Sequence, residues 1–385
     1  MSEPAPTAGL ADYARTIFTR GDIQPAWDAL MARAAADPGD AGALLDLSTI
    51  LQLVGQREQG LALQADAIAR QRWYRRTLGD GRGPRLLALV PAGDLMASTP
   101  IEFLLAGWNG TLDLLFLADG APIPVEVMDH DVAILAVGES DANAPVLAAM
   151  APLLAAWPHP LLNAAPVAAL GRDRAPVLLA GHAGLVAPPT LRLARAELRA
   201  QSFPFPIIVR PVDSHAGAGL EKLDDAEALA GYLAGQPGER FYVQPFVDYA
   251  GPDGRFRKLR VALVDGRPFI VHMAVSEHWM VHYLNAGMAE DAGKRAEEAA
   301  VFASFEADFA RRHASAFAAL HAAFGFDYFA VDCAEDRSGA LLLFEADTAM
   351  IVHDMDPPEL YPYKAPAMHR LFAAFQQMVE ARVRA

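Results

Sequence analysis

The chain has 385 residues, of which 53% are hydrophobic and 21% are charged. This length suggests two or three domains, and the composition is that of a globular protein, which excludes an intrinsically disordered chain. The formal net charge of −15 provides no basic surface, so we expect neither nucleic acid nor an anionic membrane as a partner.

Three absences bear on the cellular compartment. The first residues, MSEPAPTAGLADYA, lack a charged segment followed by an apolar core, so no secretory signal is expected. No run of about 18 apolar residues occurs, so we expect no membrane span. Cys333 is the only cysteine, which excludes an intramolecular disulfide and argues against a cysteine-based zinc site. We therefore expect a cytoplasmic protein.

The first 75 residues contain a repeat. Gly55 follows Gly21 by 34 residues, and Gly60 follows Ala26 by the same interval. The same offset relates Leu44, Leu47 and Leu51 to Leu10, Tyr13 and Ile17. A 34-residue period resembles tetratricopeptide repeats, although leucine stands at the usual tryptophan position. The alternative is a plain four-helix cap.

Two such repeats are too few for an independent solenoid. We therefore expect the helices of residues 1–75 to pack on the following domain or on a second copy of the chain. Recruitment of a protein partner and formation of a homodimer are the two interactions that this region predicts.

Residues 84–190 follow a different pattern. Three short apolar runs, RLLALVPAG, TLDLLFLADG and HDVAILAVGES, each end in glycine or polar residues. Helical stretches around 101–106 and 145–156 separate them. This alternation predicts an α/β domain with a small, doubly wound, mostly parallel sheet.

Residues 191–385 predict an α+β region with mainly antiparallel strands. Strands are expected at 205–211 and 240–246, separated by a glycine loop and a helix over 224–234. A hairpin with Asp265-Gly266 at its turn follows, and then one long alanine-rich helix through Phe324. Two further strands, YFAVDCAED and ALLLFEAD, are joined by a turn at 337–339, and a final helix begins near Pro366.

The last two strands carry three carboxylates. Glu345 and Asp347 point to the same face because side chains alternate along a strand, and Asp332 lies close to being their cross-strand neighbour. Three carboxylates on one face of an apolar hairpin would repel one another unless a cation neutralised them. Oxygen ligands favour Mg²⁺ or, alternatively, Mn²⁺, with nucleotide phosphates completing the coordination. The competing interpretation is a solvated outer face.

The glycine loop over 213–219, DSHAGAG, follows a strand that ends in Arg210. Backbone N–H groups of such a loop can approach a phosphate closely, although an ordinary surface turn has the same composition. In the next strand, Gln244 is an isolated amide within an apolar run. It either contacts an adenine amino group or is a hydrogen-bonded core glutamine.

The order of these features resembles the ATP-grasp superfamily, in particular carboxylate–amine ligases similar to glutathione synthetase and the ribosomal-protein glutamate ligases. The shared order is a basic strand end, a glycine loop, an amide-bearing strand, a Lys-x-Arg strand, and then Asp and Glu-x-Asp. The resemblance covers about residues 85–353. It implies a dinucleotide-like domain over 84–190, a pair of ATP-grasp subdomains over 191–385, and use of ATP.

The resemblance also implies roles for individual residues. The residues implied to contact phosphates are Arg174 (with Arg172 as the alternative), Arg210, Ser214, His215, Gly217, Gly219 and Lys258. The adenine hinge would be Gln244, Phe246 and Val247, and the ribose contact Asp248 or Asp253. The implied catalytic residues are Arg210 and Arg260, and the implied Mg²⁺ ligands are Asp332, Glu345 and Asp347.

The chain departs from the family pattern in two respects. Arginine replaces lysine at 210 and at 174, and it binds phosphate in a different, bidentate geometry. Asp347 replaces the usual asparagine, which adds a negative charge that only a neighbouring metal ion would make tolerable.

The substrate would be a small molecule or a peptide, and its contacts are predicted from a few basic residues. His282 and His353 are candidates because one follows the predicted hairpin and the other follows the carboxylate strand, and Arg260 is the third. No histidine lies in a metal-ligand motif.

The predicted reaction joins a carboxylate to an amine through an acyl phosphate and releases ADP and phosphate. It needs no side-chain nucleophile, which agrees with the absence of a convincing Ser–His–Asp or Cys–His arrangement. The alternatives are an ATP-grasp kinase of a small molecule and a catalytically silent tetratricopeptide and nucleotide-binding scaffold.

Overall fold

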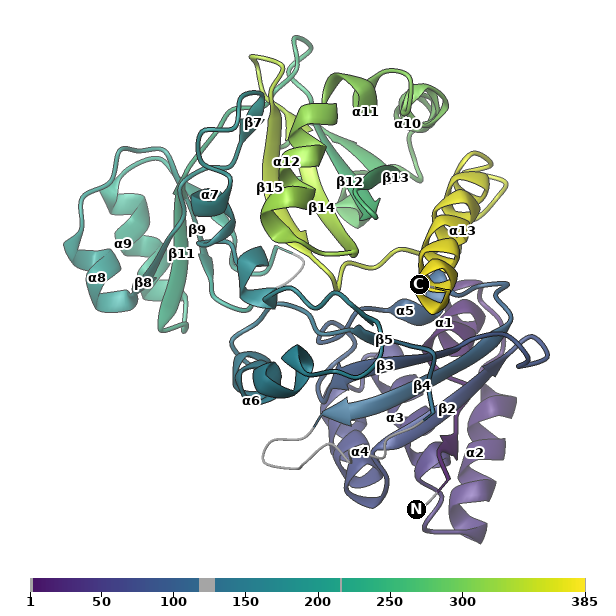
Figure 1. Cartoon of the computed structure of the whole chain (residues 1–385). Coiled ribbons are helices and arrows are strands. Elements are labelled where there is room, and N and C mark those ends of the chain that lie inside the picture. The colour runs from purple at the N-terminus through teal and green to yellow at the C-terminus, as the bar shows by residue number, and fades with distance from the viewer. Residues whose placement is uncertain (1–2, 118–128, 215–216, 385) are drawn as a thin grey trace. The chain divides into compact units, whose positions relative to one another are not determined.

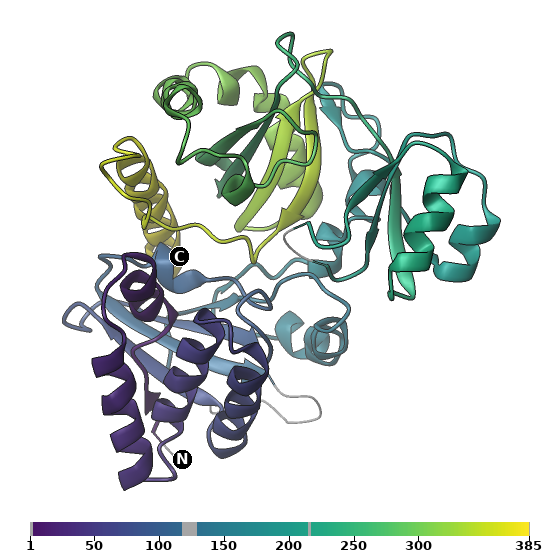
Figure 2. The same cartoon turned by 180° about the vertical axis from the view of Figure 1, so that it is seen from behind.

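The computed structural model describes residues 3–117, 129–214 and 217–384 (Figures 1 and 2). Its elements divide between two compact units. Unit 1 comprises Met1–Val167, Phe326–Phe329 and Asp347–Ala385, and unit 2 comprises Ala168–Gly325 and Ala330–Ala346. The three predicted domains over 1–75, 84–190 and 191–385 remain a prediction.

Unit 1 begins with four helices where the repeat pattern predicts helical pairs. They are α1 (Leu10–Phe18), α2 (Gln24–Ala36), α3 (Ala41–Leu53) and α4 (Arg57–Arg70). Asp40 starts α3 because its side chain accepts a hydrogen bond from the Ala43 N–H at 2.9 Å. Gly60 lets α3 and α4 approach closely, since a Cβ there would lie 3.0 Å from the Ser48 carbonyl oxygen. Their identity as tetratricopeptide repeats remains a prediction, as does partner recruitment.

The sheet of unit 1 has the order β1-β2-β4-β3-β5-β6. Its strands are β1 (Ala5–Pro6), β2 (Trp73–Leu78), β3 (Arg85–Pro91), β4 (Gly110–Leu117), β5 (Val132–Leu135) and β6 (Leu161–Leu162). The three strands expected from the apolar runs are present as β3, β4 and β5, and they are parallel. The sheet as a whole is mixed, because β2 adds an antiparallel strand that the sequence reading placed in the helical region.

The remaining helices of unit 1 are α5 (Ile101–Leu104), α6 (Ala144–Ala155) and α13 (Lys364–Val383). The first two match the stretches expected there, and α13 packs against α5 and β5. Asn163, which is fully buried and directly follows β6, accepts a hydrogen bond from the Tyr328 N–H at 2.9 Å. Unit 1 is therefore an α/β layer structure assembled from three separate parts of the chain.

Unit 2 contains an antiparallel sheet with the order β10-β9-β11-β8. Its strands are β8 (Leu191–Ala194), β9 (Ile207–Pro211), β10 (Glu221–Leu223) and β11 (Arg240–Pro245). Two helices, α8 (Arg195–Ala200) and α9 (Ala226–Gly235), supply Leu198, Leu229 and Leu233 to a core shared with Ile207 and Val209. The expected strand, helix and strand around the glycine loop are thus present.

The second sheet of unit 2 has the order β13-β12-β14-β15-β7. Its strands are β7 (Leu185–Val186), β12 (Phe256–Val264), β13 (Arg267–Ser276), β14 (Tyr328–Glu335) and β15 (Leu341–Asp347). The predicted turn joins β12 to β13, with positive φ at both Asp265 (46°) and Gly266 (73°), as a tight hairpin requires. Short helical segments η1 (Val167–Leu170), α7 (Ala175–Leu178) and η2 (Tyr283–Asn285) connect the strands.

The single long helix expected through Phe324 is wrong. Three helices stand in its place, α10 (Ala292–Ser304), α11 (Phe309–Arg312) and α12 (Ala314–Phe324). The break before α12 places the buried imidazole of His313 2.9 Å from Glu335, and it lets Phe309 pack near Phe317. Alanine-rich composition predicted a helix correctly, but the aromatic side chains need a change of direction to reach the core.

None of the helices in the described part of the chain combines the length and the apolar character needed to cross a membrane.

Candidate functional site

Two basic side chains of β12 converge on one carboxylate of β14. Lys258 and Arg260 share a face of β12 because side chains alternate along the strand. The Lys258 Nζ lies 2.8 Å from Asp332 Oδ2, and the Arg260 Nε lies 2.8 Å from Oδ1. The Asp332 side chain is only 5% exposed. Both of its oxygens are therefore held by protein cations.

The ionisation of Asp332 follows from these partners. Burial alone would raise the pKa of Asp332, but the charges of Arg260 and Lys258 outweigh it and hold the pKa well below its usual range. A buried carboxylate kept ionised by two cations is a common feature of sites that bind charged substrates.

A second group of charges lies at Glu345 in β15. Arg172 forms an ion pair with the Glu345 carboxylate and donates a hydrogen bond to the Phe344 carbonyl oxygen at 3.3 Å. Burial alone would raise the pKa of Glu345, but Arg172 and then Arg210 lower it. Arg172 and Arg210 are therefore both close enough to Glu345 to hold its carboxylate ionised.

Arg210 takes the position that strand alternation predicts. Ile207 and Val209 enter the core beneath α8 and α9, so Arg210 points to the opposite face of β9. Burial and the nearby charge of Arg172 lower the pKa of Arg210 to about 10, while Glu345 opposes this change. Arg210 as a residue is 8% exposed, and its Nε donates a hydrogen bond to Ser214 Oγ at 3.1 Å. Ser214 thus lies beside Arg210, whereas His215 is outside the described residues, and phosphate binding by Ser214 or His215 remains a prediction.

The phosphate contact was predicted at Arg174, with Arg172 as the alternative, and the two side chains have different surroundings. Arg174 is exposed at the start of α7. Arg172, the alternative residue, has a side chain that is 18% exposed and pairs with Glu345. The geometry favours Arg172 for a role in the site.

Two glycines of the loop after β9 adopt backbone angles that favour glycine. Gly217 has φ of 77° and Gly219 has φ of 65°. A Cβ at Gly219 would lie 2.8 Å from the ring of Pro211, so a side chain is excluded there on two grounds. The Gly219 carbonyl accepts a hydrogen bond from the Tyr232 hydroxyl at 2.7 Å, which holds this end of the loop to α9.

The predicted adenine hinge begins within β11, at Gln244, and continues past its end. The Gln244 side-chain oxygen accepts a hydrogen bond from Thr190 Oγ1 at 2.9 Å, so this oxygen has a protein partner. The Phe246 ring lies under the Lys222 ammonium, 4.9 Å from its centroid, and meets the Trp279 ring edge-on at 5.9 Å. A role of Gln244, Phe246 and Val247 in adenine binding remains a prediction.

The candidate ribose contacts have surface partners. Asp248 forms an ion pair with Arg337 at 2.7 Å, and Asp253 forms one with Arg257 at 2.7 Å. The pKa of Asp253 is well below its usual range, chiefly because Arg257 donates hydrogen bonds to it. These ion pairs do not favour either Asp248 or Asp253 as the ribose contact.

The three predicted metal ligands do not form a metal-ready cluster. Across the described ranges, 3–117, 129–214 and 217–384, no group of three or more histidine, cysteine, aspartate or glutamate side chains is placed to hold a metal ion. Asp332 and Glu345 are paired with basic residues, and Asp347, in unit 1, accepts a hydrogen bond from the Ala349 N–H at 3.0 Å. Carboxylate oxygens suit Mg²⁺ chemically. Metal binding by these residues remains a prediction.

The two histidines predicted to contact substrate fall in different units. His282, in unit 2, is half-buried, and its pKa is lowered by burial and then by Lys258 and Arg260. It therefore lies near the basic residues of β12. His353 belongs to unit 1, where its Nδ1 accepts from the Met355 N–H at 3.1 Å. Its role in binding substrate remains a prediction.

Two residues beside this site were not singled out from the sequence. Glu298 is fully buried in α10 and accepts hydrogen bonds from the Met273 N–H at 2.9 Å and the Tyr283 hydroxyl at 3.0 Å. Lys294 is 6% exposed, with its Nζ 2.9 Å from Glu277. Lys294, Glu298 and Phe302 follow one another at intervals of four residues, which places them on one face of a helix. This spacing is the feature of the sequence from which their burial could have been predicted.

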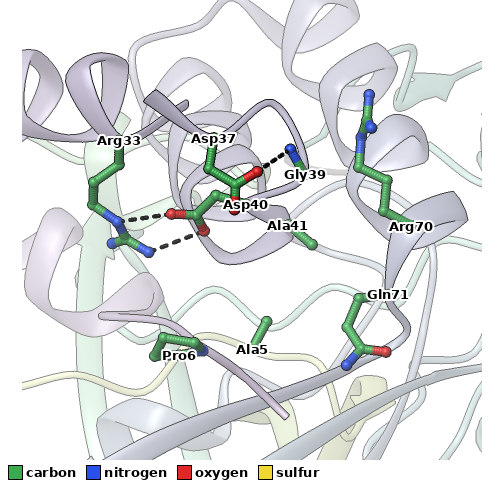
Figure 3. A pocket seen from close by; sticks show the side chains of 9 residues that line it. All are labelled: Ala5, Pro6, Arg33, Asp37, Gly39, Asp40, Ala41, Arg70 and Gln71. Atoms are coloured by element: carbon green, nitrogen blue, oxygen red, sulfur yellow. Dashed lines mark hydrogen bonds and ion pairs between the residues drawn. The ribbon is translucent and has the colours of Figure 1, made fainter. Parts of the chain in front are cut away.

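A hollow of about 440 Å³ lies elsewhere, in unit 1 (Figure 3). Its lining residues are Ala5, Pro6, Arg33, Asp37, Gly39, Asp40, Ala41, Arg70 and Gln71. Arg33 donates to both oxygens of Asp40, at 3.0 and 3.1 Å, and Asp37 accepts from the Gly39 N–H at 2.8 Å. Arg70 pairs with Asp66 at 3.0 Å. These mutual contacts point to no particular ligand.

No protein-family model and no curated protein matches the chain. Among solved structures, D-alanine–D-alanine ligase from Bacillus anthracis complexed with ATP is 14% identical, with a TM-score of 0.46, over 78% of this chain and 97% of that chain. A RimK domain protein ATP-grasp from Sphaerobacter thermophilus is 15% identical, with a TM-score of 0.41, over 77% and 99%.

The VanG D-Ala:D-Ser ligase from Enterococcus faecalis is 13% identical, with a TM-score of 0.45, over 78% of this chain and 100% of that chain. Similarities at this level do not establish a family. The functional assignment has to come from the residues of the site.

Proposed function

We propose that the chain is an ATP-dependent ligase that joins a carboxylate to an amine through an acyl phosphate and releases ADP and phosphate. One observation carries the proposal, namely four cationic side chains placed around two ionised carboxylates within unit 2. The cations are Arg172, Arg210, Lys258 and Arg260, and the carboxylates are Asp332 and Glu345. The order of motifs along the chain, which resembles the ATP-grasp superfamily, supports it.

This arrangement suits the first step of such a ligation. The carboxylate of the acid must attack the terminal phosphate of ATP, and both groups are negatively charged. Cations fixed in a partly buried site lower this repulsion and stabilise the charge that develops on the transferred phosphoryl group. Arg210, beside Ser214 of the glycine loop, and Arg172, beside Glu345, are the proposed phosphate contacts. Lys258 and Arg260 are the proposed contacts of the terminal phosphate and of the acid.

Mg²⁺, when bound, would neutralise further charge on the phosphates. Asp332, Glu345 and Asp347 are the proposed ligands. In this structure Lys258 and Arg260 contact both oxygens of Asp332. The protein cations alone account for the proposed neutralisation.

The proposal is tested by trapping the acyl phosphate. The protein is incubated with MgATP, hydroxylamine and a panel of the common amino acids and dipeptides, each offered in turn as the acid. We expect a hydroxamate, ADP and free phosphate in equal amounts for at least one acid. Omission of the acid should abolish phosphate release.

A matched pair of arginine variants sharpens this test. Arg172→Ala should slow hydroxamate formation by about tenfold to a hundredfold, the usual loss for a charge-assisted contact. Arg174→Ala, in the same segment but exposed, should change it little. Phosphate retained on the substrate would instead indicate a kinase, and binding of MgATP without ADP formation would indicate a silent scaffold. Either result overturns the ligase assignment.

A further inference from the structure

His282 is held beside the basic residues of β12 by its neighbours. His272 in β13 pairs with Arg260 across the hairpin. The Tyr283 ring contacts the His272 ring at an interplanar angle of 40°, with centroids 4.7 Å apart, and its hydroxyl donates to the buried carboxylate of Glu298 at 3.0 Å. The residue directly before Tyr283 is therefore fixed close to Arg260.

The His282 ring is half-buried, and one of its nitrogens is available to accept a proton. In the described part of the chain, neither ring nitrogen of His282 has a hydrogen-bond partner. The charged groups that face it are Lys258 and Arg260 from β12 and Asp332 from β14. Burial and the two cations lower the pKa of His282, so the imidazole is unprotonated at neutral pH and can accept a proton.

We propose that His282 is the base that takes a proton from the attacking amine during ligation. This inference rests on the proposed function, because only that reaction delivers an amine to the site. The α-amino group of a peptide has a pKa of about 8, and that of a free amino acid is higher, so the amine arrives mostly as an ammonium ion, which has no lone pair for attack. A neutral imidazole beside two fixed cations is placed to remove that proton.

One ammonium proton passes to an imidazole nitrogen of His282, and the freed lone pair attacks the acyl carbon. The bond from that carbon to the phosphate oxygen breaks, and phosphate leaves with the electron pair. The second nitrogen proton goes to the leaving phosphate, and His282 returns its proton to solvent. No oxidant, reductant or further reactant is required.

Hydroxylamine separates this role from binding and from acyl phosphate formation, because it is a weakly basic amine that is already unprotonated at neutral pH. The acid accepted by the parent protein in the hydroxylamine assay is offered again with an amino acid as the amine. His282→Gln should form hydroxamate at nearly the parent rate. It should form the amide at least about a hundredfold more slowly, the lower end of a general-base contribution.

The control is His278→Gln, which changes an exposed histidine four residues away and should leave both rates unchanged. The amide rate of His282→Gln should also recover as the pH rises, because more of the amine is then neutral. Equal loss of hydroxamate and amide, or no loss of either, overturns the role of His282 while the ligase assignment stands. Failure of the parent to form any hydroxamate overturns both proposals.

Discussion

At the scale of single residues, the site is governed by the balance between burial and charge. Asp332 and Glu345 are both removed from much of the solvent, which would favour their neutral forms. Each stays ionised because two basic side chains surround it. The sequence identified these carboxylates from their spacing but predicted metal ions as their partners. The basic partners come from distant segments, which spacing along one hairpin does not reveal.

Asp332 should make the stability of unit 2 sensitive to acid. Asp332→Asn leaves Lys258 and Arg260 without their anion and should destabilise the fold by about 3–5 kcal/mol at neutral pH. The pKa of Asp332 is lowered on folding, so its contribution is present above the unfolded pKa of about 3.9 and is lost as the pH falls below it. Thermal unfolding of parent and variant across this pH range measures the difference.

The matched control for this measurement is Asp308→Asn, which removes an exposed carboxylate paired with Arg312 in the same unit. Its unfolding temperature should stay close to that of the parent at every pH. A gap between parent and Asp332→Asn that does not narrow on acidification would show that the contacts of Asp332 act through packing and not through charge.

At the scale of elements, the local pattern of apolar and polar residues was sufficient to predict a strand or helix wherever that element buries one face. The apolar runs of β3, β4 and β5, the hairpin at Asp265-Gly266 and the carboxylate strands were all predicted in place. Prediction failed where tertiary contacts decide. The six residues of β2 form a strand by pairing with β4 and with β1, and the alanine-rich helix breaks where His313 meets Glu335.

The site residues were predictable from the sequence only where a regular element or a motif order assigns them a position. Arg210 was found because alternation assigns a face to each strand position, and Lys258 was found because the order of motifs resembles the ATP-grasp superfamily. Arg172 was named only as an alternative, because it lies in an irregular segment where no periodicity assigns a direction. Glu298 was missed because a glutamate in a charged helical run is usually exposed.

The glycine loop provides a prediction about an element. Gly219→Ala combines an unfavourable positive φ with a contact to Pro211, whereas Gly339→Ala has φ of 81° and open space around it. We expect Gly339→Ala to lower the free energy of unfolding by about 1–2 kcal/mol from backbone strain alone. Gly219→Ala should cost about 1–3 kcal/mol more, because the added carbon overpacks the loop.

Both glycines belong to unit 2, so denaturant unfolding of the two variants under one set of conditions compares them directly. Equal losses would mean that the loop shifts away from Pro211 without penalty. In that case the backbone at Gly219 is less constrained than the hydrogen bond between its carbonyl and Tyr232 indicates.

At the scale of the whole molecule, the N-terminal helices are built into unit 1. The strand β1, which precedes them, pairs with β2 at the edge of the sheet. Asp46, in α3, is 1% exposed and accepts hydrogen bonds from the Ala8 N–H at 3.0 Å and the Gly9 N–H at 3.3 Å. Glu102, in α5, accepts from the Leu10 N–H at 3.0 Å. The Asp46 contacts join α3 to the residues that precede α1, and the Glu102 contact joins the start of α1 to α5.

A chain that lacks residues 1–71 should therefore lose the fold of unit 1. Removal of α1 exposes Phe103, which is 3% exposed in the intact chain, at about 1.5–3 kcal/mol for one large apolar side chain. It also leaves the buried Glu102 without two backbone donors, since the Ala11 N–H contributes a second hydrogen bond at 3.1 Å. Because the edge strand and the layer of four helices are lost as well, we expect an aggregating chain or one with a broad, low-temperature unfolding transition.

Circular dichroism and gel filtration of the truncated and full-length proteins measure this outcome. If the truncated chain stays monomeric and unfolds like the parent, the helices form an independent module. That is the arrangement expected of a separate partner-binding domain.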